Sequence, residues 1–317
     1  MPTMMQNPKL PKPKRRLRKL NGILLLDKAL GVSSNKALQD ARFLFLAEKA
    51  GHTGSLDPLA SGMLPVCFGE ATKVSAFLLD SDKRYLTTAT LGYTSTTGDA
   101  EGEKINPRPI PDLSDAQLET VLAAFRGAIS QVPPMYSALK KDGQPLYKLA
   151  RQGVEIEREA RQVTIHQLTV LERTATTITL DVTCSKGTYI RSLVEDIGEA
   201  LGCGAYVSML RRESVDPFAG FPMYTLAQLR EIAGDGDEPN TAALEPLLLS
   251  LDKALPHVAS ATITDATITR LRQGQRVWVD MPLADADLLR LYAESGEFVG
   301  LGSVQHQVIA PKRLLVN

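Results

Sequence analysis

The hydrophobic pattern of this 317-residue chain changes near residue 250, and this change limits the folds open to it. Before residue 250, strand-like and helix-like segments are mixed without strict alternation. That mixture favours an α+β fold with a mixed β-sheet over a doubly wound parallel sheet. After residue 250, short strand-like pieces are separated by turns such as Ser295-Gly296. The sequence therefore predicts a large α+β domain followed by a small β-barrel.

Periodicity and capping residues place the expected elements along the chain. The expected strands cover residues 23–27, 85–91, 163–171, 177–184, 276–279, 288–293, 298–301 and 308–315. The expected helix caps are Ser34 or Asn35, Ser114 with Gln117, and Thr188, and the expected helix stops are Gly127 and Gly202.

Charge is balanced overall, with 36 Lys and Arg against 36 Asp and Glu, but it is unevenly placed. Residues 1–20 hold seven cations, four prolines and no acid, so a flexible basic arm is expected there. Such an arm can contact RNA or DNA, or it can act as a solubilising tail. The composition does not choose between these two roles.

Composition also limits the compartment and the kinds of site. No apolar run approaches the roughly 18 residues that a membrane-spanning helix needs, and no signal-peptide core follows Met1. The three cysteines are widely spaced and form no C-x-x-C pair, which argues against a disulfide framework or a structural zinc site. We therefore expect a cytoplasmic protein without membrane contact and without a metal site.

The segment G-H-T-G-S-L-D-P-L-A-S-G-M-L-P at residues 51–65 holds a single carboxylate, Asp57. Glycines and prolines punctuate it, so a loop rather than a regular element is expected. Small residues around a carboxylate stiffened by Pro58 would let a flat substrate approach the backbone closely. An Asp-Pro pair often only starts a turn, and residue types alone leave both interpretations open.

Two further segments hold side chains suited to a site. In C-S-K-G-T-Y-I-R, residues 184–191, Arg191 falls in the first turn of an expected helix, where a cation opposes the helix dipole. This placement suggests a buried carboxylate partner, although an exposed arginine fits the pattern equally well. In D-K-R-Y-L, residues 82–86, Tyr85 can stack on a nucleobase or be a half-buried strand aromatic.

Lys28, Lys73 and His52 are weaker candidates. Both lysines adjoin loops and could contact phosphates, but a solvated surface lysine is the simpler interpretation of each. His52 is the only histidine beside a candidate site, and a lone histidine is more often structural. The sequence has no dinucleotide fingerprint, P-loop, G-x-S-x-G elbow or HExxH motif.

Taken in order, these segments resemble the TruB family of tRNA pseudouridine synthases. Residues 51–65 resemble the catalytic loop of that family almost residue for residue, and five other motifs occur in the family's order. They are N-G-I-L-L-L-D-K-A-L-G-V-S-S-N (21–35), D-S-D-K-R-Y-L (80–86), P-P-M-Y-S-A-L-K (133–140), C-S-K-G-T-Y-I-R-S-L (184–193) and L-R-R (210–212). The C-terminal stretch, with R-Q-G-Q-R-V (272–277) and A-P-K-R-L-L (310–315), resembles a PUA domain. The resemblance therefore covers about residues 20–317.

The resemblance implies a domain organisation. Residues 21–250 would form a mixed-sheet pseudouridine-synthase catalytic domain, with an insertion at about residues 105–160. Residues 251–317 would form a PUA-like RNA-binding β-barrel, and residues 1–20 would be the basic arm that many members carry. A stand-alone bacterial-type enzyme is implied, working as a monomer without an obligatory protein partner.

The resemblance also assigns roles to individual residues. Asp57 would be the catalytic carboxylate, and Tyr85 would stack on the target base. Arg191 would pair with Asp57 and hold its pKa down in a buried site, which keeps it ionised. Four further residues would line or support the pocket or lie beside the flipped nucleotide: Tyr189, Lys73, Leu210 and His52.

The implied reaction converts uridine to pseudouridine at position 55 in the T arm of tRNA. It breaks the C1′–N1 bond and forms a C1′–C5 bond without redox chemistry, so no cofactor is expected. One carboxylate can stabilise the charge at the sugar, and three routes stay open for Asp57: attack on C1′, attack on C6, or removal of a C2′ proton. The base must first leave its stack. Two alternatives are a non-catalytic tRNA-binding or tRNA-folding protein with the same surface, and a nucleoside hydrolase, which would need a second carboxylate.

Overall fold

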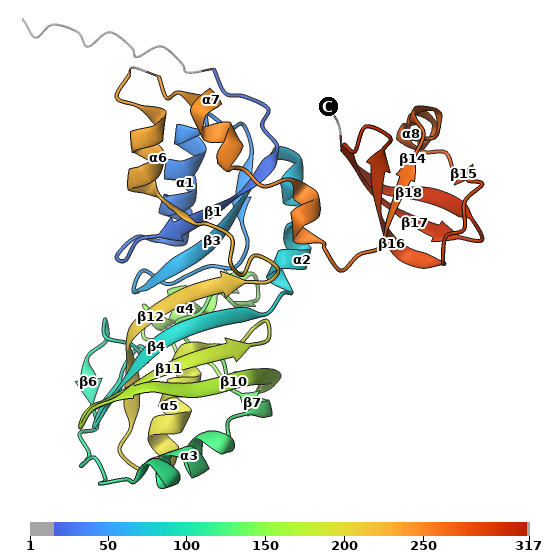
Figure 1. Cartoon of the computed structure of the whole chain (residues 1–317). Coiled ribbons are helices and arrows are strands. Elements are labelled where there is room, and N and C mark those ends of the chain that lie inside the picture. Colours follow the sequence, from blue (N-terminus) through green and yellow to red (C-terminus); the bar gives the residue numbers. More distant parts are fainter. Residues whose placement is uncertain (1–15, 237, 316–317) are drawn as a thin grey trace, which may run out of the picture.

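The structure is a computed structural model that describes residues 16–236 and 238–315. Helices pack on two main β-sheets, which confirms the predicted α+β class (Figure 1). Most of the predicted basic arm, residues 1–15, lies outside the described residues. No helix in the described part of the chain is long and apolar enough to cross a membrane. All three cysteines are buried free thiols.

Nine strands form the large sheet, in the order β13-β1-β3-β12-β4-β11-β10-β7, with β2 paired to β3. β1 runs parallel to β13 and β3 runs parallel to β12, whereas the other neighbours are antiparallel, so the sheet is mixed as predicted. The strands are β1 Gly22–Lys28, β2 Ala50–His52, β3 Ala60–Phe68, β4 Lys83–Leu91, β7 Gly127–Gln131, β10 Arg161–Arg173, β11 Thr177–Cys184, β12 Ala205–Val215 and β13 Tyr224–Thr225. Two small hairpins pair β5 Thr94–Ser95 with β6 Lys104–Ile105, and β8 Lys140–Lys141 with β9 Gln144–Pro145.

Helices cover the two ends of this sheet separately. α1 and α6 pack near β1 and β3, whereas α3 and α5 pack under β4, β10 and β11 (Figure 1). Both faces of β1 are buried, because Leu24 and Leu26 face α1 while Ile23 and Leu25 face the opposite layer. The helices are α1 Ser34–Leu44, α2 Ser75–Leu79, α3 Asp115–Ala123, α4 Leu146–Ala150, α5 Ile190–Ala200, α6 Leu226–Ala233 and α7 Thr241–Leu244, with 3-10 turns η1 Gly69–Lys73, η2 Glu245–Leu247 and η3 Leu251–Ala254.

The parallel pair β3–β12 joins the two halves of the large sheet. It contains three registered residue pairs, of which the last matches Arg212 with Gly62. Gly62 has a φ of +99°, and a Cβ atom there would lie 2.2 Å from the carbonyl oxygen of Arg212. Only glycine lets the two backbones approach this closely.

We expect Gly62→Ala to lower the free energy of unfolding by about 3 kcal/mol or more, because the added methyl group meets backbone that cannot move aside. Gly274→Ala is the matched control, since Gly274 has a φ of +80° but open space around its Cβ position. That control should lower the free energy of unfolding by about 1 kcal/mol, which is the cost of placing an L-residue at a positive φ without any steric clash. Equal losses in urea unfolding would contradict the steric explanation.

A second sheet follows in the C-terminal part, with the order β14-β16-β17-β18-β15. It has its own apolar core, to which Ile268 and Leu271 of α8 contribute. The sequence predicted the last four strands but neither β14 nor α8. The elements are β14 Ser260–Ile263, α8 Asp265–Arg272, β15 Val277–Trp278, β16 Ala286–Ala293, β17 Phe298–Gln305 and β18 Val308–Leu314.

Lys73 of η1 connects the two sheets. Its Nζ donates a hydrogen bond to the carbonyl oxygen of Leu314 at 3.2 Å, and the Arg313 guanidinium donates to the carbonyl oxygen of Lys73. Leu301 of β17 also packs into the layer that contains Leu251 of η3. The small sheet therefore contacts the large one through side chains and backbone.

The prediction that residues 51–65 form one loop is wrong. Residues 50–52 and 60–68 are strands, so the irregular part covers residues 53–59. Glycine usually interrupts a regular element, but Gly62 lies inside β3 because β12 passes too close for a side chain.

Three predicted helix boundaries are also wrong. The N-cap of α1 is Ser33, whereas Ser34 begins the helix and bonds elsewhere. Thr188 does not cap α5, because its hydroxyl donates to the carbonyl oxygen of Ser185. Gly127 opens β7 instead of ending α3. The two N-caps lie one residue away from the predicted ones, at Ser33 and Tyr189, and α3 ends with its C-cap at Ala124, three residues before Gly127.

Candidate active site

A cavity of about 310 Å³ lies where β3 and β12 meet. Its walls come from the loop before β3, the start of β4, the turn before α5, and β12. Strands from both halves of the sheet are therefore needed to form it. The lining side chains with chemical interest are Asp57, Tyr85, Tyr189, Arg191, Leu210 and Arg212.

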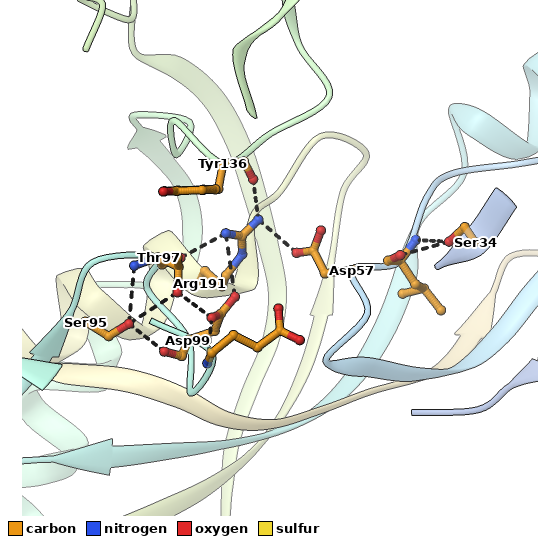
Figure 2. Close-up of polar contacts among 9 residues, drawn as sticks. Ser34, Asp57, Ser95, Thr97, Asp99, Tyr136 and Arg191 are labelled. Carbon is orange, nitrogen blue, oxygen red and sulfur yellow. Dashed lines mark hydrogen bonds and ion pairs between the residues drawn. The ribbon is translucent and has the colours of Figure 1, made fainter. Parts of the chain in front are cut away.

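Asp57 and Arg191 form the central ion pair, with 2.8 Å between Oδ2 and Nη2 (Figure 2). The Arg191 side chain is only 4% exposed. Its guanidinium donates to the carbonyl oxygens of Thr97 at 2.9 Å and Tyr136 at 2.6 Å, and Asp99 Oδ2 lies 3.8 Å from Nη1. Two backbone carbonyls and two carboxylates thus fix Arg191, which explains a cation in the first turn of α5.

The loop that carries Asp57 is held by Ser34, which lies beside it (Figure 2). Ser34 Oγ donates to the carbonyl oxygen of Leu56 at 2.8 Å and accepts from the Leu56 N–H at 2.7 Å. On the other side, the Ala60 N–H donates to the carbonyl oxygen of Asp57 at 3.0 Å. These bonds fix the backbone on both sides of the carboxylate, so its side chain is directed into the cavity.

Burial raises the pKa of Asp57 above its ordinary value, and the Arg191 guanidinium opposes that shift. Asp99 adds to the increase, whereas Lys28 opposes it. The Arg191 effect has the expected sign, but burial is the larger influence. The side chain is still 45% exposed, so the carboxylate is accessible from the cavity.

Lys28 is buried at the end of β1, so the interpretation as a solvated surface lysine is wrong. Its Nζ donates to the carbonyl oxygens of Ala29 at 3.0 Å and Val32 at 2.6 Å, which turn back over the strand end. Burial lowers the pKa of Lys28 to about 8, while Asp57 raises it and Arg212 lowers it further. Lys28 therefore acts on the cavity through its charge near Asp57.

Tyr85 lines the cavity from β4 and lies directly opposite Arg212 of β12 in the antiparallel register. Burial raises the pKa of the Tyr85 hydroxyl, and Arg212 opposes that shift through its charge and a hydrogen bond. Leu210, two residues earlier on β12, lies on the same cavity wall. An aromatic ring, an aliphatic side chain and an ion pair therefore face one space.

Tyr189 occupies the N-cap position of α5 and also lines the cavity. Its backbone N–H and carbonyl group both bond to the buried Gln131 side chain, at 2.8 and 3.1 Å. The Arg161 guanidinium lies 5.0 Å from the centre of the Tyr189 ring, which is cation–π distance. Gln131 thus fixes the backbone of Tyr189, and Arg161 packs against its ring.

The structure does not bring Lys73 or His52 to the cavity wall. Lys73 pairs with Glu70 and contacts β18, so it does not line the cavity, and its role in supporting the pocket stays a prediction. His52 lies on β2 opposite Val66, and its buried Nδ1 has no hydrogen-bond partner among the described residues. Burial and Arg212 lower the pKa of His52, which favours the neutral ring.

Sequence reasoning missed Asp99 and Arg212. Asp99 is buried and bonds to Thr97, which carries the carbonyl that Arg191 uses. The motif L-R-R at 210–212 pointed to β12, but it did not show which arginine faces inward. Within residues 16–236 and 238–315, no three His, Cys, Asp or Glu side chains gather as a metal site would require.

Three family models match consecutive parts of the chain. The model of the TruB family pseudouridylate synthase N-terminal domain matches residues 42–190. The tRNA pseudouridylate synthase B C-terminal domain matches residues 191–256, and the C-terminal model of pseudouridine synthase II TruB matches residues 259–315. The matches follow each other in the order expected of one family.

Individual proteins agree with these matches. The chain is 52% identical over 304 residues to tRNA pseudouridine synthase B of Pseudomonas putida strain GB-1, covering 95% of this chain and 98% of that protein. It is 48% identical over 303 residues to the Marinomonas sp. strain MWYL1 protein of the same name, covering 95% and 97%. A solved Cbf5-Nop10-Gar1 complex contains a chain with a TM-score of 0.69 and 27% identity, covering 92% of this chain and 84% of that one. The chain therefore belongs to the TruB family of pseudouridine synthases.

Proposed function

We propose that the protein isomerises uridine to pseudouridine in tRNA, at position 55 of the T arm, with Asp57 as its catalytic carboxylate. One observation carries this proposal: among the described residues the cavity wall offers a single carboxylate, Asp57, which is held by the buried Arg191 beside the Tyr85 ring. The relatives named for tRNA pseudouridine synthesis supply the substrate class.

Asp57 would act on the sugar and base while it is ionised. Breaking the C1′–N1 bond builds positive charge at the sugar, and a carboxylate can stabilise or trap that charge. Arg191 would supply orientation and keep the carboxylate ionised against the burial that raises its pKa. A hydrolase would use a second carboxylate as general acid, and the cavity wall among the described residues presents Asp57 alone.

Tyr85 would stack on the detached base and hold it while it turns, a contact worth roughly 1–3 kcal/mol per base. Leu210 and Tyr189 would confine the base laterally, since both line the same cavity. A base can enter this cavity only after leaving its stack, so the proposal includes base flipping. His52 would lie beside the flipped nucleotide, outside the wall itself.

RNA contacts beyond the cavity would come from cations and from the C-terminal sheet. We assign Lys73 to the tRNA backbone next to β18, while Lys28 supports Asp57 from inside. Residues 251–317 would form the PUA-like RNA-binding unit, and residues 1–20 would add charge. The enzyme would act on tRNA alone, as a monomer and without a protein partner.

Tritium release tests the proposal directly. In a T-arm stem-loop labelled at C5 of uridine, formation of the C1′–C5 bond must displace the C5 hydrogen. We expect release approaching one equivalent per target uridine, and none from a stem-loop with cytidine at that position. Release of free uracil, or no tritium release from the T-arm substrate, would contradict the proposal.

A further inference from the structure

Arg212 is a second buried arginine at the cavity, and it is bonded differently from Arg191. Its exposed fraction is 1%, and it is among the largest fully buried side chains of the described residues. Nε donates to the carbonyl oxygen of Met63 at 2.7 Å, and Nη2 donates to that of Gly54 at 3.0 Å. Both acceptors lie in the other half of the sheet, so the side chain crosses from β12 to β3 and its loop.

The charge of Arg212 has no carboxylate partner in the part of the chain that the structure describes. Arg191 contacts Asp57 and Asp99, and the adjacent Arg211 pairs with Asp27 at 2.9 Å and Glu213 at 3.0 Å. Arg212 contacts only neutral groups, namely two backbone carbonyls and the Tyr85 hydroxyl. A buried charge without a counter-ion is unfavourable, so its presence at a cavity points to an anionic ligand or intermediate.

The field of Arg212 reaches several titratable groups around the cavity. Burial lowers the pKa of Lys83 to about 8, and Arg212 adds to that decrease. Arg212 also lowers the pKa values of Lys28 and His52, after the larger effect of burial. The cavity is therefore positive on the Arg212 side, while Asp57 supplies negative charge on the other.

We infer that Arg212 stabilises the negative charge that the pyrimidine acquires during isomerisation. This inference rests on the proposed function, because it assigns a partner to the base half of that reaction. Asp57 then serves the sugar, and Arg212 serves the base beside Tyr85. Preorganised positive charge of this kind acts on the transition state more than on the bound substrate.

The negative charge on the base follows from where the bonding electrons go during the reaction. When the C1′–N1 bond breaks, both bonding electrons stay on the base and are shared by N1, O2 and O4. After the base turns, C5 donates an electron pair to C1′, the C5 proton leaves, and N1 gains a proton. If Asp57 instead attacked C6, the displaced electrons would again move onto O4. If Asp57 removed a C2′ proton, the base would likewise leave C1′ with both bonding electrons. The base is therefore anionic at some stage by each of these routes, and Arg191 is already neutralised by two carboxylates.

If Arg212 had only a structural role, its replacement would lower the rates with two different substrates equally. Comparing two substrates therefore separates a structural role from stabilisation of the anionic base. We would measure single-turnover rates with T-arm stem-loops that carry uridine or 5-fluorouridine at the target position, following loss of the starting nucleoside. Fluorine at C5 withdraws electrons and stabilises the anionic base. Because the anion of 5-fluorouracil is more stable than that of uracil, the rate with 5-fluorouridine should depend less on Arg212.

We expect Arg212→Met to lower the rate with uridine by about 10²–10³-fold, as when one donor of an oxyanion site is removed. The loss with 5-fluorouridine should be several-fold smaller, and stem-loop affinity should change little. Arg211→Met is the matched control, because Arg211 is adjacent, points to the other face and has its own carboxylates. That control should stay within about twofold of wild type on both substrates.

Arg212→Lys covers the case in which Arg212→Met does not fold. It keeps the charge and loses the two-pronged contact with Gly54 and Met63, so its loss with uridine should be smaller than about 10²-fold and again smaller with 5-fluorouridine. Equal losses on the two substrates, or wild-type rates, would overturn the inference for either variant. A wild-type protein that forms no pseudouridine would refute the proposed function instead, so the two failures are distinguishable.

Discussion

Asp57→Asn is expected to abolish pseudouridine formation while tRNA affinity stays within a few-fold of wild type. The amide has nearly the same volume but cannot carry the negative charge, so the rate should fall by about 10⁴-fold or more. Folding should be preserved, because Arg191 keeps Asp99 and its two backbone acceptors. Tritium release and filter binding with the same T-arm stem-loop would measure both effects.

Asp40→Asn is a suitable control for this variant, since Asp40 lies on α1 away from the cavity and pairs with Lys36 and Arg230 at the surface. A near wild-type rate for Asp57→Asn would remove Asp57 from the mechanism. Refolding of a misfolded tRNA by the inactive variant would reveal a second, non-catalytic role of the same surface. If Asp57→Asn lost tRNA refolding together with pseudouridine formation, there would be no evidence for a role separate from catalysis.

Arg191→Met should have the second-largest effect, because it leaves two carboxylates without their shared cation. We expect a rate loss of about 10²–10⁴-fold, together with destabilisation of roughly 3–5 kcal/mol from an unpaired buried charge. Arg191 normally lowers the pKa of Asp57 against the effect of burial. Its removal raises that pKa, so less of Asp57 is ionised at a given pH and the acid limb of the pH–rate profile moves to higher pH.

A pH–rate profile under single-turnover conditions would test this shift, with thermal melting to follow stability. Arg230→Met is the control, since Arg230 is 60% exposed on α6 and its pairing distance to Asp40 is 3.9 Å. Surface pairs of this kind contribute little, so neither the profile nor the melting temperature should change appreciably. An unshifted acid limb in Arg191→Met would mean that Arg191 does not control Asp57 ionisation.

Much of the fold could be predicted because its signals are local. The alternation in β11 and the capping box of α3 identify those elements from neighbouring residues alone. Asp57, Tyr85 and Arg191 were also predicted to meet, and the structure places all three on one cavity. That prediction needed the family's ordered motifs, since residue types alone left each of them ambiguous.

Other features depend on contacts between distant segments and could not be derived locally. Arg211 and Arg212 are neighbours of the same type on one strand, so they face opposite sides, but only the strand pairing decides which side is interior. Lys28 is buried because the turn after β1 folds its carbonyls over the ammonium group. Gly62 belongs to a strand for the same kind of reason, the close approach of β12.

The short parallel junction between β3 and β12 has a consequence for the dynamics of the protein. Asp57 belongs to one side of that junction, whereas Tyr85, Arg191 and Leu210 belong to the other. A separation of a few ångströms there would dismantle the cavity and would also part Leu56 and Ala60 from the core residues of the other side. A nucleotide that contacts residues on both sides must therefore oppose local separation of β3 from β12. Its binding should slow the exchange of the Leu210 to Arg212 amide protons with heavy water, more than that of amides in the separate core of the C-terminal sheet.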